Sequence, residues 1–405
     1  MDSERDTSSG AARLLLQEAL DALAASLWEP AVRSAGQALA IAPSTGFQIV
    51  ALDVLAMAHH GVGNHEAASM AAIEALRLGS AESVPVVLEI AGRYVADGDA
   101  GRGIGLLEDA HLASPAISSI VAALATHSQQ CGNYPGAIRW LEALDRIDPA
   151  GATGRRSSID ALRDTVARNA QTRAVIDRIG VRVGAICHQQ VTSGPFAGQR
   201  LEHEHDFGWV ATLIGCYEME LHPAIEHVIA SIPRRVINVG CSGGYYAVGF
   251  ARRIPSAHVI AFDIDATARE SCMRAALENG VAGRIDIRAA CSPSTLEELA
   301  GPGTVVFSDC EGYELQLLDP DVVPSLRETT IIVELHDIWI PNLAPRLLAR
   351  FAQTHDISHI AMIPRDASRY PILKQAGLSD SEMSLAVSDF RAPGMTWAYM
   401  VPRLP

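Results

Sequence analysis

Two apolar segments in the C-terminal half of the chain end in side chains that can do chemistry. These side chains are Asp309 and Glu311, after residues 304–308, and His336 and Asp337, after residues 330–335. An apolar core does not hold unpaired carboxylates or a histidine, so these groups do not look like packing residues. In open α/β sheets, ligands bind at the carboxyl ends of the strands. We therefore expect the four side chains to share one edge of a sheet.

Two functional interpretations of these residues remain open. In the first, His336 is a general base that takes a proton from a substrate hydroxyl, with Asp309 and Glu311 beside it, because the ordinary pKa of histidine suits that role near neutral pH. In the second, Asp309, His336 and Asp337 bind a divalent cation such as Mg²⁺ or Mn²⁺, for which carboxylates and one imidazole are suitable ligands. In a purely structural interpretation, Glu311 and Glu314 cap the next helix, and His336 bonds to one of them.

A turn of small residues indicates a bound nucleoside. The apolar run 236–239 meets Gly-Cys-Ser-Gly-Gly at 240–244, and a second apolar run ends at Asp263. Strand, glycine turn, helix, strand and acid form one nucleotide-binding unit, in which the acid accepts hydrogen bonds from the ribose hydroxyls. The dehydrogenase pattern needs a third glycine where Tyr245 stands, and the phosphate-binding loop needs a lysine, so the turn favours a nucleoside without phosphates. Asp265 is the competing acid.

The pattern of apolar runs predicts the elements that position these groups. Strands are expected at 235–239, 258–262, 284–288, 304–308, 330–335, 358–364 and 395–402, with the last one antiparallel to its neighbour. Helices are expected at 244–254, 266–280, 293–300 and 341–353, preceded by a helix at 159–179, strand-like residues at 181–191 and a helix within 208–232. Five parallel strands closed by a hairpin resemble the sheet of class I S-adenosylmethionine methyltransferases.

Two motifs resemble one methyltransferase family. VINVGCSGGYYAVGFA (236–251) resembles motif I of the FkbM-type methyltransferases, and VFSDCEGYELQLL (306–318) resembles their fourth-strand motif. The resemblance covers roughly residues 190–400 and implies a doubly wound, Rossmann-like α/β fold with S-adenosylmethionine as cofactor. It implies these cofactor contacts: Asn238, Gly240, Cys241, Ser242, Gly244, Tyr245, Asp263 and Asp309. Asn238 stands where the family has an acid, and Ser242 where it has asparagine. The placement of Asp309 and of the His336-Asp337 pair also resembles that in cation-dependent O-methyltransferases.

These features predict an S-adenosylmethionine-dependent methyltransferase that acts on a hydroxyl of a small metabolite, a sugar or a natural-product scaffold. The alternative is a methyltransferase for a protein or carrier-bound substrate docked by the N-terminal region. A third hypothesis, motivated by Asn238, is a non-catalytic adaptor. Residues expected to wall the methionyl arm are Tyr217, Glu218, Tyr245 and Tyr246. Residues after the sixth strand that either read a polar substrate or form a solvated edge are Arg365, Arg369 and Tyr370.

The N-terminal third repeats itself. Its helix ends align at residues 43, 79, 115 and 149, and small residues recur at the expected helix crossings. Residues 11–150 follow an all-α pattern, and their period of about 34 residues resembles that of tetratricopeptide repeats. Such an array docks a protein partner, packs as a scaffold, or self-associates. We expect a linker helix and lead-in segment at 151–232, opened by a polar break at 151–158, and the methyltransferase domain at 233–405.

Bulk composition narrows the function classes. The chain has 405 residues, is 48% hydrophobic and 20% charged, and carries a net charge of −15, which argues against nucleic acid or an anionic membrane as the main partner. Its seven cysteines are scattered without a C-x-x-C pair, so we expect a reducing compartment with neither a disulfide framework nor a zinc site. No signal peptide or membrane-length apolar run is present, which predicts a cytoplasmic protein.

Overall fold

The computed structural model describes residues 2–96, 99–201, 207–338, 340–392 and 394–403. It divides into two compact units, Met1–Ala167 and Arg168–Pro405, and the division falls inside one long helix, α9 (Ala152–Cys187). The domain boundaries at 150/151 and 232/233 stay predictions. Within the described residues, no helix combines the length and the apolar character that a membrane span requires.

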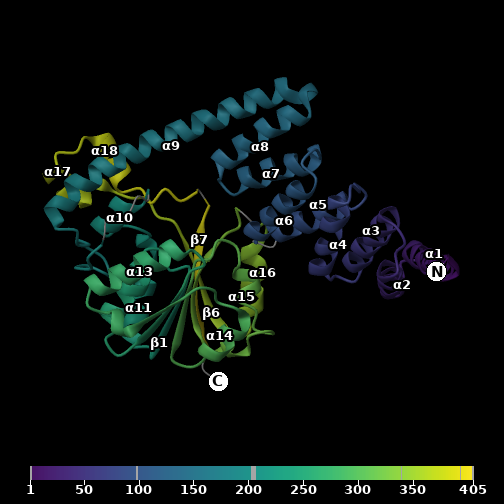
Figure 1. Ribbon diagram of the computed structural model, residues 1–405. Helices are drawn as coiled ribbons and strands as arrows, with labels where there is room; N and C mark the ends of the chain where they lie inside the picture. Colours follow the sequence, from purple (N-terminus) through teal and green to yellow (C-terminus); the bar gives the residue numbers. More distant parts are fainter. Residues whose placement is uncertain (1, 97–98, 202–206, 339, 393, 404–405) are drawn as a thin grey trace. The chain divides into compact units, whose positions relative to one another are not determined.

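The first unit is built from helices that pack in consecutive pairs, α1 with α2, α3 with α4, α5 with α6 and α7 with α8. Their bounds are α1 Asp2–Ala24, α2 Trp28–Ala40, α3 Thr45–Gly61, α4 His65–Arg77, α5 Val84–Ala96, α6 Ala100–Ala113, α7 Ser118–Gln130 and α8 Tyr134–Ile147. The second helix of each pair starts 34 to 37 residues after that of the preceding pair (Figure 1). The unit is therefore helical and periodic, and its assignment to tetratricopeptide repeats stays a prediction.

A recurring turn sets this spacing. Asn64, Asp99 and Asn133 each precede the second helix of a pair, and each side chain accepts a hydrogen bond from a backbone N–H in the first turn of that helix. Gly103 of α6 has no room for a side chain, because an added Cβ would lie 2.7 Å from the carbonyl oxygen of Ala91 in α5. The caps thus fix where α4, α6 and α8 begin, and a small residue lets the paired helices approach closely.

Helix α9 extends beyond the predicted helix at both ends. The polar break expected at 151–158 is wrong, because the helix already begins at Ala152. Those residues include no proline, and arginine and alanine continue a helix readily.

The strand expected at 181–191 is also wrong, because α9 continues to Cys187. Ile176, Ile179 and Val183 are buried at intervals of three and four residues, which is the period of a helix and not of a strand. The turn after α9 is closed by a single antiparallel bridge between Gln190 and Arg200.

The second unit contains a seven-stranded sheet with helices on both faces (Figure 1). Its strands are β1 Arg235–Val239, β2 His258–Phe262, β3 Ile285–Arg288, β4 Thr304–Ser308, β5 Thr330–Leu335, β6 His355–Ala361 and β7 Thr396–Pro402. Its helices are α10 Trp209–Ile214, α11 His222–Ser231, α12 Tyr245–Arg253, α13 Ala266–Glu278, α14 Pro293–Leu299, α15 Glu314–Leu317, α16 Leu343–Phe351, α17 Pro371–Gln375 and α18 Asp380–Ala386. The predicted strands 235–239, 258–262, 304–308 and 330–335 are confirmed to the residue.

The strand order is β3-β2-β1-β4-β5-β7-β6. Strands β1 to β5 are parallel, and β7 is antiparallel to both β5 and β6, which confirms the doubly wound sheet and its reversed last strand. The order reverses between β1 and β4, and ligands bind at this point in doubly wound sheets, above the carboxyl ends of the strands.

Apolar layers cover both faces of the sheet. One layer includes Phe250 of α12 and Phe307 of β4, and the other includes Val306 of β4 and Leu347 of α16. Since both faces are covered, every residue of β4 is buried, and the strand reads as a continuous apolar run rather than an alternating one. The helix expected within 208–232 is instead two helices, because Gly215 takes a left-handed conformation and ends α10.

Candidate functional site

The turn after β1 is packed against the loop after β4. Gly240 has a φ of +77°, and a Cβ built on it would lie 1.6 Å from the carbonyl oxygen of Asp309. The backbone N–H of Asp309 also donates to the carbonyl of Val239 at 2.9 Å. Glycine at 240 is therefore required by a contact within the protein itself, and not only by the approach of a ligand.

Replacing Gly240 by alanine is expected to lower the free energy of unfolding by about 2–5 kcal/mol, because it adds left-handed strain to a backbone clash. Gly280→Ala is the matched control, since Gly280 has a φ of +67° but open space around its Cβ position. That control should lose only about 1–2 kcal/mol in urea denaturation. Equal losses in the two variants would contradict the close contact between the two loops.

Two further residues of the turn face the core. Cys241 is buried, and its thiol hydrogen-bonds to that of Cys272 in α13. Gly244 has a φ of +90°, and a Cβ there would lie 3.0 Å from the Cys272 sulfur. These predicted cofactor contacts therefore have only their backbone to offer a ligand. Because Gly244 precedes α12 without a side chain that could cap it, the first N–H groups of α12 suit such a ligand.

Asp263 ends β2 at the same edge of the sheet. Its two carboxylate oxygens accept hydrogen bonds from the backbone N–H groups of Ser242 and Asp265, both at 2.9 Å. Asp265, the competing acid, instead caps α13 by accepting from the N–H of Thr267 at 2.8 Å. A carboxylate oxygen accepts more than one hydrogen bond, so Asp263 can still receive ribose hydroxyls while it braces the turn.

Asn238 lies in β1, between Ala261 of β2 and Phe307 of β4. Its side chain is fully buried, and neither its Oδ1 nor its Nδ2 has a hydrogen-bond partner among the described residues. Leaving a buried amide unpaired costs about 1–3 kcal/mol per group, so a ligand or a water is its natural partner.

Tyr245 lies in a cluster of aromatic rings that joins α12 to the lead-in segment. Its ring centroid lies 5.3 Å from that of Phe196, 6.1 Å from Tyr217 and 5.1 Å from Tyr246. Tyr246 is buried and donates its hydroxyl to Glu218. The residues expected to surround the methionyl arm are therefore close together, although the side chain of Tyr246 is part of the hydrophobic core.

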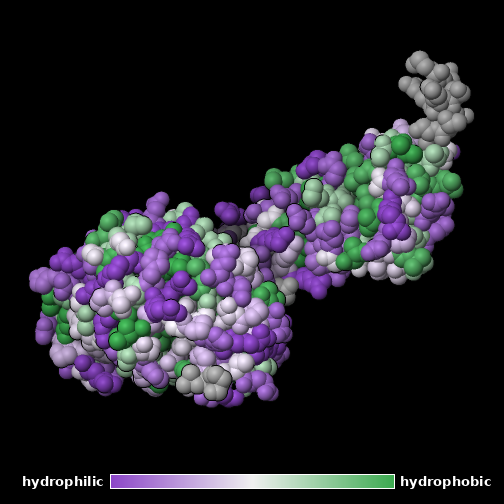
Figure 2. Space-filling model, turned by 90° about the horizontal axis from the view of Figure 1, so that it is seen from below, coloured by the Kyte–Doolittle hydropathy of each residue, from purple (hydrophilic) through white to green (hydrophobic). Residues whose placement is uncertain are grey.

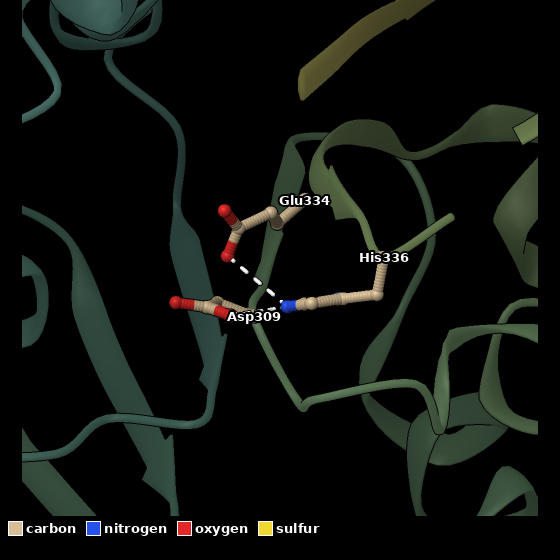
Figure 3. A group of neighbouring side chains, drawn as sticks. All are labelled: Asp309, Glu334 and His336. Carbon is tan, nitrogen blue, oxygen red and sulfur yellow. Dashed lines mark ion pairs between the residues drawn. The ribbon is translucent and has the colours of Figure 1, made fainter. Parts of the chain in front are cut away.

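His336 is the centre of a cluster of acids at the carboxyl ends of β4 and β5. It is fully buried, and its Nδ1 lies 2.9 Å from Glu314. Its Nε2 lies 3.2 Å from Glu334 and 3.5 Å from Asp309 (Figure 3). The same nitrogen lies 3.6 Å from Glu311. The structure thus brings the three predicted catalytic residues together and adds two acids, one of which, Glu314, both binds His336 and begins α15, as the structural interpretation expected.

The charges of this cluster follow from burial and hydrogen bonding. Burial alone would lower the pKa of His336, but the neighbouring carboxylates of Glu314 and Glu334 outweigh it and raise the pKa to about 11. Burial opposes ionisation of Glu334, yet the neighbouring His336 and Asp309 lower its pKa to about 2. Burial and the neighbouring Glu334 raise the pKa of Asp309 well above its usual range. Without a bound cation, the surrounding carboxylates therefore favour the protonated form of His336, which does not suit the general-base interpretation.

Asp337, a predicted cation ligand, does not belong to the cluster. Both of its carboxylate oxygens accept from the N–H of Ala344 in α16, at 3.2 and 3.3 Å. Glu334 takes its place, because Asp309, Glu334 and His336 each offer a ligand atom within 4.8 Å of the others. The sequence carried this signal: Glu334 is an acid inside an apolar strand and lies two residues before His336, hence on the same side of the chain.

Arg391, which sequence reasoning missed, holds the acids of this region together. It pairs with Glu334, with Glu220 at 2.9 Å and with Glu218 at 3.6 Å, and its side chain is only 7% exposed. Burial, with the nearby Glu334, raises the pKa of Glu218 to about 8. Arg391 lies in the long polar excursion before the last strand, where nothing in the sequence distinguishes it from a surface arginine.

Arg365 is not part of a solvated edge, because it is buried among acids. Its side chain is 8% exposed and forms ion pairs with Glu220, at 2.7 Å, and with Asp389. The other two residues predicted to read a substrate, Arg369 and Tyr370, line a cavity of about 500 Å³, a size that suits a small organic molecule. Met219 lines the same cavity, so the segment around it contributes both to the cavity and, through Glu218 and Glu220, to the acid cluster.

Comparisons with known proteins find likeness in solved structures alone: no family model matches the chain and no curated protein sequence is similar to it. The O-methyltransferase TomG from Streptomyces achromogenes, solved with S-adenosylmethionine, is 13% identical and covers 50% of this chain and 92% of its own, with a TM-score of 0.29. The O-methyltransferase from Bacillus cereus, solved with SAH, is 11% identical and covers 57% of this chain and 91% of its own, with a TM-score of 0.31.

A human methyltransferase 10 domain containing protein is 13% identical, covers 50% of this chain and 89% of its own, and has a TM-score of 0.32. Likenesses at these TM-scores carry no argument by themselves. The fold assignment therefore rests on the strand order and the strand directions of the second unit.

Proposed function

We propose that the second unit is an S-adenosylmethionine-dependent methyltransferase that methylates a hydroxyl of a small metabolite, a sugar or a natural-product scaffold. The observation that carries the proposal is the joint placement of a glycine turn after β1 and of Asp263 after β2, beside the switch point of a sheet in this order. A nucleoside above that edge places its ribose at Asp263. A fold does not by itself determine a function, so the proposed activity depends on the residues of the site.

The residues of this edge fit such a cofactor. Asn238 presents two buried polar atoms without a partner, which is what a ligand with donors and acceptors satisfies. Asp263 holds the ribose, and the open N–H groups at the start of α12 face the ligand. S-adenosylmethionine supplies an electrophilic methyl group on a sulfonium. The amide of Asn238 carries no charge, so a hydrogen bond replaces the charge pairing that an acid at this position would give.

The acid cluster lies at the carboxyl ends of β4 and β5, the edge of the sheet at which the proposed reaction would need its acceptor hydroxyl. Methyl transfer from a sulfonium depends mainly on the alignment of acceptor oxygen, methyl carbon and sulfur, so the chain's task is to bind and orient the acceptor. An imidazolium at His336 cannot take the acceptor's proton, and a carboxylate with a pKa of about 2, as in Glu334, is a weak base. The convergence of Asp309, Glu334 and His336 within 4.8 Å favours the second use expected from the sequence, a cation site.

Two finer assignments belong to the same proposal. The motifs at 236–251 and 306–318 support an FkbM-type enzyme, and the repeating caps of the first unit support tetratricopeptide-like repeats. The alternative, a protein or carrier-bound substrate docked by the helical unit, is favoured by the exposed apolar side chains there, among them Leu14, Met70 and Leu112. Figure 2 shows apolar residues interspersed with polar ones on the helical unit. Comparing turnover of a free acceptor with that of the same acceptor attached to a carrier separates the two substrates.

Binding of S-adenosylmethionine tests the proposal. Wild-type protein is expected to bind it in calorimetry, and Asp263→Ala is expected to weaken the binding about tenfold or more, because hydrogen bonds to a charged group are lost. Asp265→Ala is the matched control: that acid caps α13 and should leave the affinity near the wild-type value. A folded wild-type protein that binds no S-adenosylmethionine would remove the proposal.

A further inference from the structure

Three ligand atoms from β4 and β5 converge on one point. They are Oδ1 of Asp309, Oε2 of Glu334 and Nε2 of His336, and all three lie within 4.8 Å of one another (Figure 3). We propose that Asp309, Glu334 and His336 together bind one divalent transition-metal ion of the Mn²⁺ class. The proposal replaces the ligand Asp337, expected from the sequence, by Glu334.

The separations match the edges of a coordination polyhedron. Ligand atoms that sit at right angles around an ion, each bound at about 2.1 Å, lie about 3 Å apart. The Nε2 of His336 lies 3.2 Å from Glu334 and 3.5 Å from Asp309, so two edges are already close to that value. The third edge, between Asp309 and Glu334, is at most 4.8 Å, and the side chain of Asp309 is 27% exposed.

Two of the converging atoms have no hydrogen-bond partner among the described residues. His336 is fully buried, and neither its Nε2 nor Oδ1 of Asp309 makes a hydrogen bond among the described residues. Buried polar atoms are nearly always paired, so an unpaired imidazole nitrogen beside an unpaired carboxylate oxygen indicates a partner outside the chain. The two carboxylates also balance the charge of a divalent ion.

The groups behind the ligands are those that metal sites use. Glu314 is fully buried and lies 2.9 Å from Nδ1 of His336, so that nitrogen donates to the carboxylate. A bound ion displaces the proton from Nε2, which then presents its lone pair to the ion. This carboxylate–histidine arrangement orients and strengthens metal-binding histidines. Arg391 forms an ion pair with the other carboxylate oxygen of Glu334, Oε1, and so orients that ligand as Glu314 orients His336. One imidazole with two carboxylates favours Mn²⁺ or Fe²⁺ over Ca²⁺ and Mg²⁺, which prefer oxygen ligands alone.

The role of the ion rests on the proposed function, whereas its binding does not. A cation at this edge lowers the pKa of an acceptor hydroxyl beside it. The hydroxyl gives its proton to water, its oxygen forms a bond to the methyl carbon, and the carbon–sulfur bond breaks with the electron pair remaining on sulfur. The step is not a redox reaction and consumes no co-reactant beyond the methyl donor.

Titration of the full chain with Mn²⁺ alone, without S-adenosylmethionine, tests the site. The free ion is counted by electron paramagnetic resonance, and we expect one bound Mn²⁺ per chain. Glu334→Gln and Asp309→Asn should each remove measurable binding, and Glu314→Gln should weaken it about 10- to 100-fold by releasing the imidazole. Asp337→Asn is the matched control, because its side chain caps α16, and it should bind Mn²⁺ like the wild type.

Circular dichroism verifies that each variant is folded, and Asp309, at 27% exposed, is less buried than Glu334 and His336, so Asp309→Asn should disturb the core least. Failure of the folded wild type to bind Mn²⁺ would overturn the inference, and so would a loss of binding in Asp337→Asn equal to that in Glu334→Gln. Binding of Mn²⁺ by a chain that does not bind S-adenosylmethionine would leave this inference standing and remove only the proposed function.

Discussion

Replacing Arg391 by methionine is expected to lower the free energy of unfolding by about 3–5 kcal/mol, because it leaves buried carboxylates without their cation. Arg391 faces Glu218, Glu220 and Glu334, all of them buried. Methionine keeps much of the side-chain volume, so the loss reports charge rather than a cavity. Urea denaturation followed by circular dichroism measures it.

Arg403→Met supplies the control for this prediction. Arg403 pairs with Asp356, but both side chains are at least half exposed, at 51% and 78%. An exposed ion pair contributes little, so this variant should lose less than about 1 kcal/mol. If Arg391→Met lost no more than Arg403→Met, the acids around Arg391 would have to be solvated or protonated rather than held by its charge.

The stability of the protein is expected to fall as the pH rises from 7 to 9, and His336→Gln should reduce that slope by the share of one proton. The pKa of His336 is raised from its ordinary value near 6.5 to about 11 in the folded chain. Between these values the folded state holds a proton that the unfolded state has lost, so higher pH favours unfolding. The stabilisation is fully present below pH 6.5 and is lost as the pH rises through 11.

One proton corresponds to a slope of about 1.4 kcal/mol for each pH unit. Denaturation at several pH values in the presence of a chelator measures it. His355→Gln is the control: His355 is also buried, but burial lowers its pKa, so its titration lies below pH 6.5. A wild-type slope above pH 7 that survives unchanged in His336→Gln would assign the proton to another group, such as Glu218, whose raised pKa of about 8 gives a slope of the same sign up to that pH.

Much of the second unit could be predicted from the sequence, because its strands are buried on both faces and read as continuous apolar runs. The segments 235–239 and 304–308 are strands to the residue, and Gly240 marks the turn between β1 and α12. The polar residues at the ends of β4 and β5 were also predicted to meet at one edge, and Asp309 and His336 do meet there.

The composition of the site could not be predicted to the same extent, because tertiary contacts decide which acids face inward. Glu334 and Asp337 are three residues apart, and the local pattern does not say that the first points to His336 and the second caps α16. Arg391 reaches Glu334 across 57 residues of sequence. The alternation of apolar and polar residues in 181–191 resembles that of a strand. The segment is nevertheless helical, because Ile179 and Val183 pack into the core from one face of a helix.

The position of β7 has a consequence for the order in which the chain folds during synthesis. This strand lies between β5 and β6, and among the described residues β6 bonds to β7 alone. Until the ribosome has released residues up to Pro402, β5 keeps an open edge and β6 has no neighbour. Arg391 leaves the ribosome only shortly before β7, so until then the acids that it neutralises have no cation beside them. The nascent second unit therefore carries an incomplete sheet and an unbalanced charge together, and both are resolved by the same late segment.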